Sequence, residues 1–211
     1  MYNVVKIKRG IGNLINRKKG DNRKMTEIIL SVRPKWCELI ASGRKTIEVR
    51  KTKPKCDVPF KVYIYCTQSR IPVSYNGSIV MFEDDLAITN RFGCGKHVAN
   101  PYGMLMEGEF LLNCTVIGEF VCDRVYELVT QSQGGSYYVK GEDQSITNDV
   151  ARHSCLTLKD MHEYLRSNVG YGWHISDLVI YDKPKDLSDF GMKRPPQSWC
   201  YVEKERESND E

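Results

Sequence analysis

Two basic residues and one acidic residue lie close together in the first quarter of the chain, where they could act on one ligand. Lys45, Glu48 and Arg50 fall within six residues, and polar and apolar residues alternate through this segment. A period of two is typical of a β-strand, so Thr46, Glu48 and Arg50 share one face. A carboxylate and a guanidinium on one face can form a charge-assisted pair. They supply the acceptor and the bidentate donor that read a base edge or hold a phosphate. We therefore predict a polar ligand site here.

The elements before this segment are predicted to position it. Thr26–Arg33 is dense in β-formers and predicts a strand, and Pro34 suits the first position of a helix. Gly43 can end that helix in a left-handed turn, so Lys45 begins the charged strand directly after a helix. Ser31 and Arg33, at the end of the first strand, are second-rank candidates for ligand contact. Trp36 lies on the apolar stripe of the helix, where core packing is the favoured role.

The remaining pattern predicts a small sheet protein with two insertions. Strands are expected at 60–66, at 171–181 and at 199–202, and 109–129 suggests one long strand or two with a bulge near Gly118. Thr157, with Asp160 three residues later, predicts the capping box of a second helix. The stretches 67–107 and 130–154 are irregular and are interpreted as insertions, and 204–211 is a charged tail. We expect an α+β fold with a small mixed sheet, closed or half closed.

Composition and charge narrow the function classes. Hydrophobic residues make up 41% and charged residues 27% of the chain, values typical of globular proteins. No apolar run approaches the roughly 18 residues of a membrane span, and the N-terminus has no apolar signal-peptide core. We therefore expect a soluble, cytoplasmic protein with no membrane partner.

The basic character is confined to residues 1–24. They carry eight bases and one acid, a net charge of +7, whereas residues 25–211 carry a net charge of −3. Such an arm suits binding to nucleic acid or to a membrane surface, and a misplaced start before Met25 explains it equally well. The eight cysteines show no C-x-x-C spacing, and Cys94 and His97 lack a second pair of metal ligands. We expect reduced, structural cysteines, no metal and no cofactor.

Three segments resemble a known family. Gly43–Arg50 fits the pattern G-x-K-x-x-E-x-R after the Ser-Val-Arg-Pro run, and Val116–Glu127 and Gly170–Phe190 look like later strands of the same domain. Together they resemble the ASCH family (activating signal cointegrator homology) of the PUA-like superfamily, in particular its bacterial and phage members. The resemblance spans residues 26–203. It implies an α+β fold with a small mixed β-barrel, short helices and a cleft beside the motif that takes a nucleobase or short single-stranded nucleic acid.

The resemblance also implies candidate functions. We expect first the binding of RNA or of a modified nucleobase or nucleoside in this cleft. The candidate contacts are Lys45, Thr46, Glu48, Arg50, Ser31, Arg33 and His174. His174 is included because it projects to the face opposite Trp173, which is itself expected in the core.

Three alternatives stay open. Some ASCH-like proteins are amidohydrolases that remove an acyl group from N4-acylated cytidine with a lysine and a threonine. Lys45 matches the lysine, but Glu48 stands at the threonine position and cannot form the ester of a threonine nucleophile, although it can act as a base toward water. As a ribonuclease, the chain would use Lys45 and Glu48 as acid and base. A phage-type protein-interaction module, built on the insertions, is the third alternative.

Overall fold

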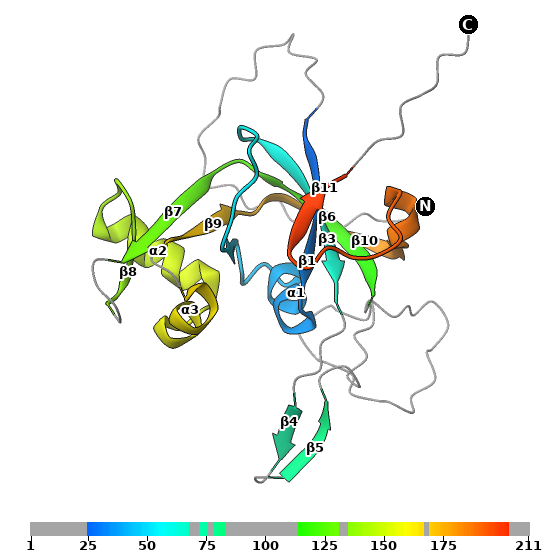
Figure 1. Ribbon diagram of the computed structural model, residues 1–211, viewed down its shortest axis with the longest axis horizontal. Coiled ribbons are helices and arrows are strands. Elements are labelled where there is room, and N and C mark those ends of the chain that lie inside the picture. The colour runs from blue at the N-terminus through cyan, green and yellow to red at the C-terminus, as the bar shows by residue number, and fades with distance from the viewer. Residues whose placement is uncertain are drawn as a thin grey trace, which may run out of the picture.

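The computed structural model describes residues 25–67, 72–75, 78–82, 114–130, 135–166 and 169–202 of the 211-residue chain. Two sheets and three α-helices form the fold, and a separate hairpin projects from it (Figure 1). The basic arm, the Cys94–His97 element, the charged tail and most of the insertion 67–107 lie outside the described residues. No helix in the described part of the chain is long and apolar enough to cross a membrane.

The larger sheet has five strands in the order β10-β6-β3-β1-β11. These strands are β1 (Glu27–Val32), β3 (Phe60–Cys66), β6 (Thr115–Cys122), β10 (Ser176–Lys185) and β11 (Trp199–Tyr201). β1 pairs with β3 in parallel, and the other pairs of this sheet are antiparallel. The predicted strands at 26–33, 60–66 and 199–202 are thereby confirmed.

The smaller sheet has four strands in the order β2-β9-β7-β8, all antiparallel. Its strands are β2 (Ile47–Arg50), β7 (Val125–Thr130), β8 (Tyr137–Val139) and β9 (Val169–His174). β4 (Pro72–Tyr75) and β5 (Ser78–Phe82) form the separate hairpin inside the first insertion. The charged motif therefore lies on an edge strand of the smaller sheet.

Three α-helices and one short 3-10 helix, η2 (Leu187–Phe190), complete the described fold. α1 (Pro34–Ala41) starts at the predicted proline, and Gly43 has the positive φ of 71° that a left-handed turn requires. α3 (Leu158–Leu165) starts at the predicted Thr157 and Asp160 capping box. α2 (Gln144–Ser154) and α3 lie beside the smaller sheet (Figure 1).

Two apolar clusters hold the elements together. The first gathers β1, β3, β6, α1 and β9 around Trp173, whose ring meets Phe60 and Trp199 edge-on at centroid distances of 5.4 and 5.8 Å. The second lies between the smaller sheet and α2 and α3, and it includes Ile47 and Val49 of β2. β2 is therefore buried on both faces: its apolar side chains enter the second cluster, and its polar side chains face the other way.

Three predictions about the strands need correction. The described strands do not close into a barrel, because β11 and β10 end one sheet and β2 and β8 end the other, without backbone pairing between the sheets. The expected strand at 171–181 is two strands in different sheets, β9 and β10, and Asp177 beside their junction has φ of 46°. Likewise 109–129 contains β6 and β7 in different sheets, broken at Asp123 and Arg124; the part before residue 114 lies outside the described residues.

The second insertion is more regular than its polar sequence indicates. Residues 130–154 were predicted to be irregular, but they contain β8 and α2. Asp143 caps α2 by accepting a hydrogen bond from the backbone N–H of Ile146 at 2.9 Å, and Val150 is buried against the sheet. An interior residue every three or four positions is enough to dock a short helix, even when its mean hydropathy is low.

The capping box of α3 gives a prediction for stability and acid titration. The Thr157 hydroxyl accepts from the Asp160 amide at 3.1 Å. The Asp160 carboxylate in turn accepts from the Thr157 hydroxyl at 2.7 Å and from the Thr157 amide at 2.9 Å, and these two hydrogen bonds lower the pKa of Asp160. Thr157→Ala is expected to lower the free energy of unfolding by about 1 kcal/mol. The lowered pKa of Asp160 stabilises the fold at pH values above about 3.9, the pKa of an aspartate in the unfolded chain. This contribution is lost as the pH falls through the pKa of Asp160 in the folded protein. The substitution weakens the contribution, so the variant will lose less stability between pH 7 and pH 3 than the wild type. Chemical denaturation at both pH values tests this, and equal losses would contradict it.

Candidate functional site

Lys45, Glu48 and Arg50 converge on one another as the sequence predicts. Glu48 Oε1 lies 2.8 Å from a terminal nitrogen of Arg50, and Glu48 Oε2 lies 3.3 Å from Lys45 Nζ. All three residues are buried, at 2%, 5% and 7% exposure for Lys45, Glu48 and Arg50. The group is therefore not an ordinary ion pair on a solvated strand. We call the three residues the charged triad.

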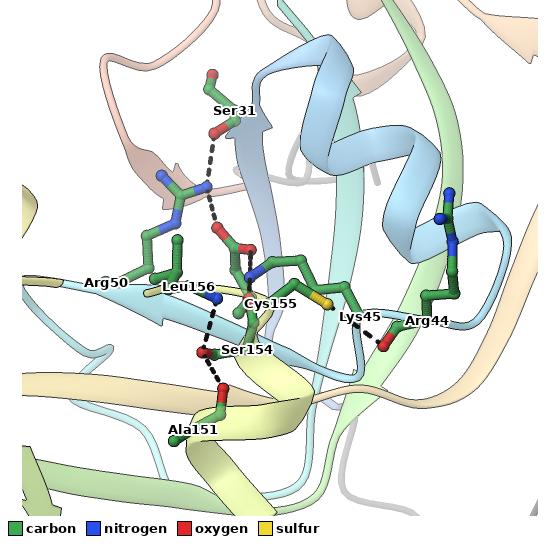
Figure 2. A network of polar contacts seen from close by, with 9 residues as sticks. Ser31, Arg44, Lys45, Arg50, Ala151, Ser154, Cys155 and Leu156 are labelled. Atoms are coloured by element: carbon green, nitrogen blue, oxygen red, sulfur yellow. Dashed lines mark hydrogen bonds and ion pairs between the residues drawn. The ribbon is translucent and has the colours of Figure 1, made fainter. Parts of the chain in front are cut away.

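Backbone carbonyl groups from both sides hold the two cations (Figure 2). Lys45 Nζ donates to the carbonyl of Ser154 at the end of α2, at 2.5 Å. Arg50 donates to the carbonyl of Ser31 in β1 at 2.7 Å. The charged triad thus lies where the two sheets meet, and side chains bridge the gap that backbone pairing leaves open.

The local chain geometry explains why these side chains enter the interior. The amide of Lys45 donates to the carbonyl of Leu39 in α1 at 2.9 Å, which fixes the turn after Gly43. Glu48 is the cross-strand partner of Trp173, and Arg50 is that of Tyr171. The same face of β2 that carries the two charges is therefore pressed against the aromatic side chains of β9.

The charged triad leaves charge and hydrogen-bonding capacity unused. At formal charges it holds two cations and one anion, so one positive charge is uncompensated within it. Among the described residues, Arg50 Nε is buried and has no hydrogen-bond partner, and Glu48 Oε2 is buried with an ion-pair contact to Lys45 Nζ at 3.3 Å but no hydrogen bond. A buried polar atom without a partner costs about 1–3 kcal/mol. A ligand that supplies an acceptor, a donor or a negative charge would remove this penalty.

Two aromatic side chains border the charged triad. Lys45 Nζ lies 5.1 Å from the centre of the Trp36 ring, which is only partly buried, so its role extends beyond the expected core packing. Tyr164 of α3 interacts with both Arg50 and Glu48, and its pKa is raised, mainly by burial. Tyr164 is nevertheless 37% exposed, so it separates the triad from solvent. Leu158, the first residue of α3, is exposed as well.

The second-rank candidates, Ser31, Arg33 and Thr46, differ in their burial and in their contacts with the charged triad. Ser31 is buried, and its hydroxyl donates to the carbonyl of Pro196 at 2.6 Å, so only its own carbonyl reaches Arg50. Arg33 is exposed at the start of α1 and lies near enough to Tyr164 for its charge to oppose the burial that raises the pKa of Tyr164. Thr46 is half-buried, and its backbone bonds to His153 and Ile175. Of these three, Ser31 contacts the triad through its carbonyl group, and Arg33 is an exposed cation.

His174 does not join the group. Its Nδ1 lies 2.6 Å from Asp123 Oδ1, in the turn between β6 and β7. In the β2–β9 register His174 is opposite Ile47, a residue of the second apolar cluster, whereas Glu48 is opposite Trp173. Because side chains alternate along a strand, His174 points away from the face that carries the triad. No pattern in the sequence predicted Asp123 as the partner of His174.

Thiols and metal ligands play a limited part in the described residues. The seven described cysteines form no disulfide bond with one another. Burial and a contact with Cys66 raise the pKa of Cys37, whose thiol also feels the charges of Glu48 and Arg50, so this thiol stays protonated at neutral pH. In the described part of the chain, no three His, Cys, Asp or Glu side chains are placed to hold a metal ion.

Comparison with known proteins supports the fold. Residues 30–117 match the family model of the ASCH domain, a range that includes the whole charged triad. ASCH from Zymomonas mobilis superposes with a TM-score of 0.52 at 16% identity, covering 85% of this chain and 90% of that chain. A mutant of the same protein superposes with a TM-score of 0.50 at 15% identity, covering 85% of this chain and 89% of the mutant chain. Among curated proteins, no sequence matches significantly. At these identities the likeness to the solved structures shows the fold alone.

Proposed function

Because this chain carries an ASCH domain, we propose that it binds RNA or a modified nucleobase or nucleoside, and that the charged triad is the recognition element. The observation that supports the proposal best is the buried Nε–H of Arg50, which has no hydrogen-bond partner among the described residues, beside Glu48 Oε2, which has an ion-pair contact with Lys45 but no hydrogen bond. A base edge presents donors and acceptors side by side, so it can satisfy a carboxylate and a guanidinium together. A phosphate would compensate the excess positive charge of the triad.

The buried ion pairs argue for a functional role on energetic grounds. Replacing a buried ion triad with packed apolar side chains is often neutral or stabilising, so such a group is weak support for stability. Packed apolar side chains in place of all three charges could therefore stabilise the fold as well as the charged triad does. Their retention beside Trp36 and Tyr164, which offer faces for base stacking, fits a ligand site.

A second candidate function is hydrolysis of N4-acylated cytidine. The contact of 3.3 Å between Lys45 Nζ and Glu48 Oε2 places a proton donor beside a base. Glu48 would activate water, and Lys45 would stabilise the charge that develops on the amide oxygen. The same pair would serve as acid and base in a ribonuclease.

The test compares Lys45→Met with Lys61→Met. Lys61 pairs with Glu119 at 3.0 Å on the larger sheet, and both side chains are partly exposed, so the control removes a paired lysine away from the triad. Calorimetric titration with cytidine, N4-acetylcytidine and a mixed-sequence hexaribonucleotide measures binding, and chromatography of each mixture detects cytidine or cleaved RNA. Loss of one charge-assisted hydrogen bond is expected to weaken binding by about 10- to 100-fold in Lys45→Met.

The outcomes separate the candidates. Binding by the wild type and by Lys61→Met, without a new product, supports the binding function. Cytidine released from N4-acetylcytidine by the wild type but not by Lys45→Met would establish the amidohydrolase instead. Unchanged affinity in a folded Lys45→Met variant would contradict a role of the charged triad in either function.

A further inference from the structure

Three exposed lysines follow the charged triad directly. Lys51, Lys53 and Lys55 occupy alternate positions in the segment that leaves β2, and all are exposed. Among the described residues, no carboxylate lies within ion-pair distance of these three. By contrast, Lys61 and Lys140 each pair with a glutamate at 3.0 Å. The segment therefore presents an uncompensated positive charge, although residues 25–211 as a whole are slightly acidic.

Each of these lysines lies beside a tyrosine. Lys51 Nζ is 5.4 Å from the ring centre of Tyr164, and Lys53 Nζ is 5.5 Å from that of Tyr171. The backbone N–H of Lys55 donates to the hydroxyl of Tyr201 at 2.8 Å. The tyrosines belong to α3, β9 and β11, which lie far from the three lysines in sequence, so the fold assembles this arrangement. We call it the lysine–tyrosine strip, and its members are Lys51, Lys53, Lys55, Tyr164, Tyr171 and Tyr201.

The strip is continuous with the charged triad. Tyr164 interacts with Arg50, and Tyr171 is the cross-strand partner of Arg50. Farther along, the hydroxyl of Thr52 accepts from the indole of Trp199, which meets Tyr201 edge-on at 5.6 Å. Tyr164 and Tyr201 are 37% and 41% exposed, so part of each remains open to a ligand. After the buried Arg50, the chain therefore continues into an exposed surface that carries lysine side chains and tyrosine rings.

We propose that the lysine–tyrosine strip is a second binding surface, which binds the nucleotides of an unpaired strand that continue beyond the one held at the charged triad. Lysines neutralise backbone phosphates, and exposed rings stack on bases without regard to sequence. A duplex hides its base faces, and an acidic peptide has no planar groups to stack, so the combination favours an unpaired strand. This inference rests on the proposed function.

The experiment uses two triple variants with the same loss of charge. Lys51→Gln, Lys53→Gln and Lys55→Gln are combined in the strip variant, and Lys140→Gln, Lys159→Gln and Lys185→Gln in the control. Lys140 and Lys159 pair with glutamates outside the strip, and Lys185 lies over Tyr181. Affinity for cytidine and for a mixed-sequence dodecamer of RNA, of DNA and of duplex RNA is measured across a range of salt concentrations. A poly-glutamate peptide serves as a polyanion without bases.

The strip variant is expected to bind single-stranded dodecamer at least tenfold more weakly, to keep its affinity for cytidine, and to melt at the same temperature as the wild type. Its slope of log affinity against log salt will fall by about 2, which is three contacts at about 0.7 each. The RNA and DNA arms decide whether the 2′-hydroxyl contributes.

Equal losses in the two triple variants, or binding of duplex or poly-glutamate as tight as that of the single strand, would overturn this inference. So would a dodecamer that binds no more tightly than cytidine, while the proposed function would stand. If the wild type binds neither cytidine nor any dodecamer, both the proposed function and this inference fail.

Discussion

Glu48→Leu will lower the free energy of unfolding by about 3–5 kcal/mol, the range measured when one partner of a buried ion pair is removed. Glu48 is the carboxylate that contacts both Lys45 and Arg50, and all three are almost fully buried. Without it, two cations would face each other at short range, with carbonyl groups as their remaining partners. Urea denaturation at neutral pH measures the change.

Two controls define the cause of that loss. Glu142→Leu removes the partner of Arg124 from an ion pair that is substantially exposed, and should change stability by no more than about 1 kcal/mol. The triple variant with Lys45→Met, Glu48→Leu and Arg50→Met removes all three charges, so it should recover most of the stability that Glu48→Leu loses. If the triple variant is less stable than Glu48→Leu, the charged triad is a structural requirement of the fold.

Trp173→Ala is expected to lower the free energy of unfolding by about 3–5 kcal/mol, the range for deletion of a large aromatic side chain from a core. Trp173 has no exposed surface, and its ring is surrounded by Phe60, Trp199 and aliphatic side chains of β1, β3 and β6. Trp173 is also the cross-strand partner of Glu48. The variant will therefore weaken both the junction of the sheets and any binding at the triad.

Trp173→Phe separates packing from polarity. The indole N–H is buried and has no hydrogen-bond partner among the described residues, so its removal relieves a penalty of about 1–3 kcal/mol. This gain offsets part of the loss from the smaller ring, and the variant should lose less than half of what Trp173→Ala loses. Thermal and urea denaturation of both variants measure the difference. Equal losses in the two variants would show that the indole N–H is not a liability.

The part of the fold that the sequence predicts well is local. Pro34, Gly43 and the alternation around β2 are signals that act within a few residues, and they specify the helix, the turn and the charged strand correctly. Glu48 and Arg50 come together for the same reason, since their separation along one strand face fixes the contact. Thr157 and Asp160 likewise form a capping box within a single turn.

The features that the sequence did not predict depend on contacts between distant elements. Lys45 Nζ is held by a carbonyl 109 residues away, and a backbone carbonyl has no signature in sequence. Burial of the charged triad follows from β9 and α3 packing beside β2, which alternation alone cannot distinguish from a solvated face. The predicted barrel closure is wrong for a similar reason. Closure depends on which strand edges form backbone pairs, and here the Arg50 side chain, rather than a backbone pair, connects the two sheets.

The most direct test of the central claim follows the Nε–H of Arg50 by NMR while cytidine and the hexaribonucleotide are titrated into the protein. Its resonance can be assigned by its absence in Arg50→Lys, which keeps the charge. Because this N–H has no partner among the described residues, a ligand bound at the charged triad should shift the resonance and slow its exchange with water. Saturation of binding with the Arg50 Nε–H resonance unchanged would contradict recognition by the charged triad.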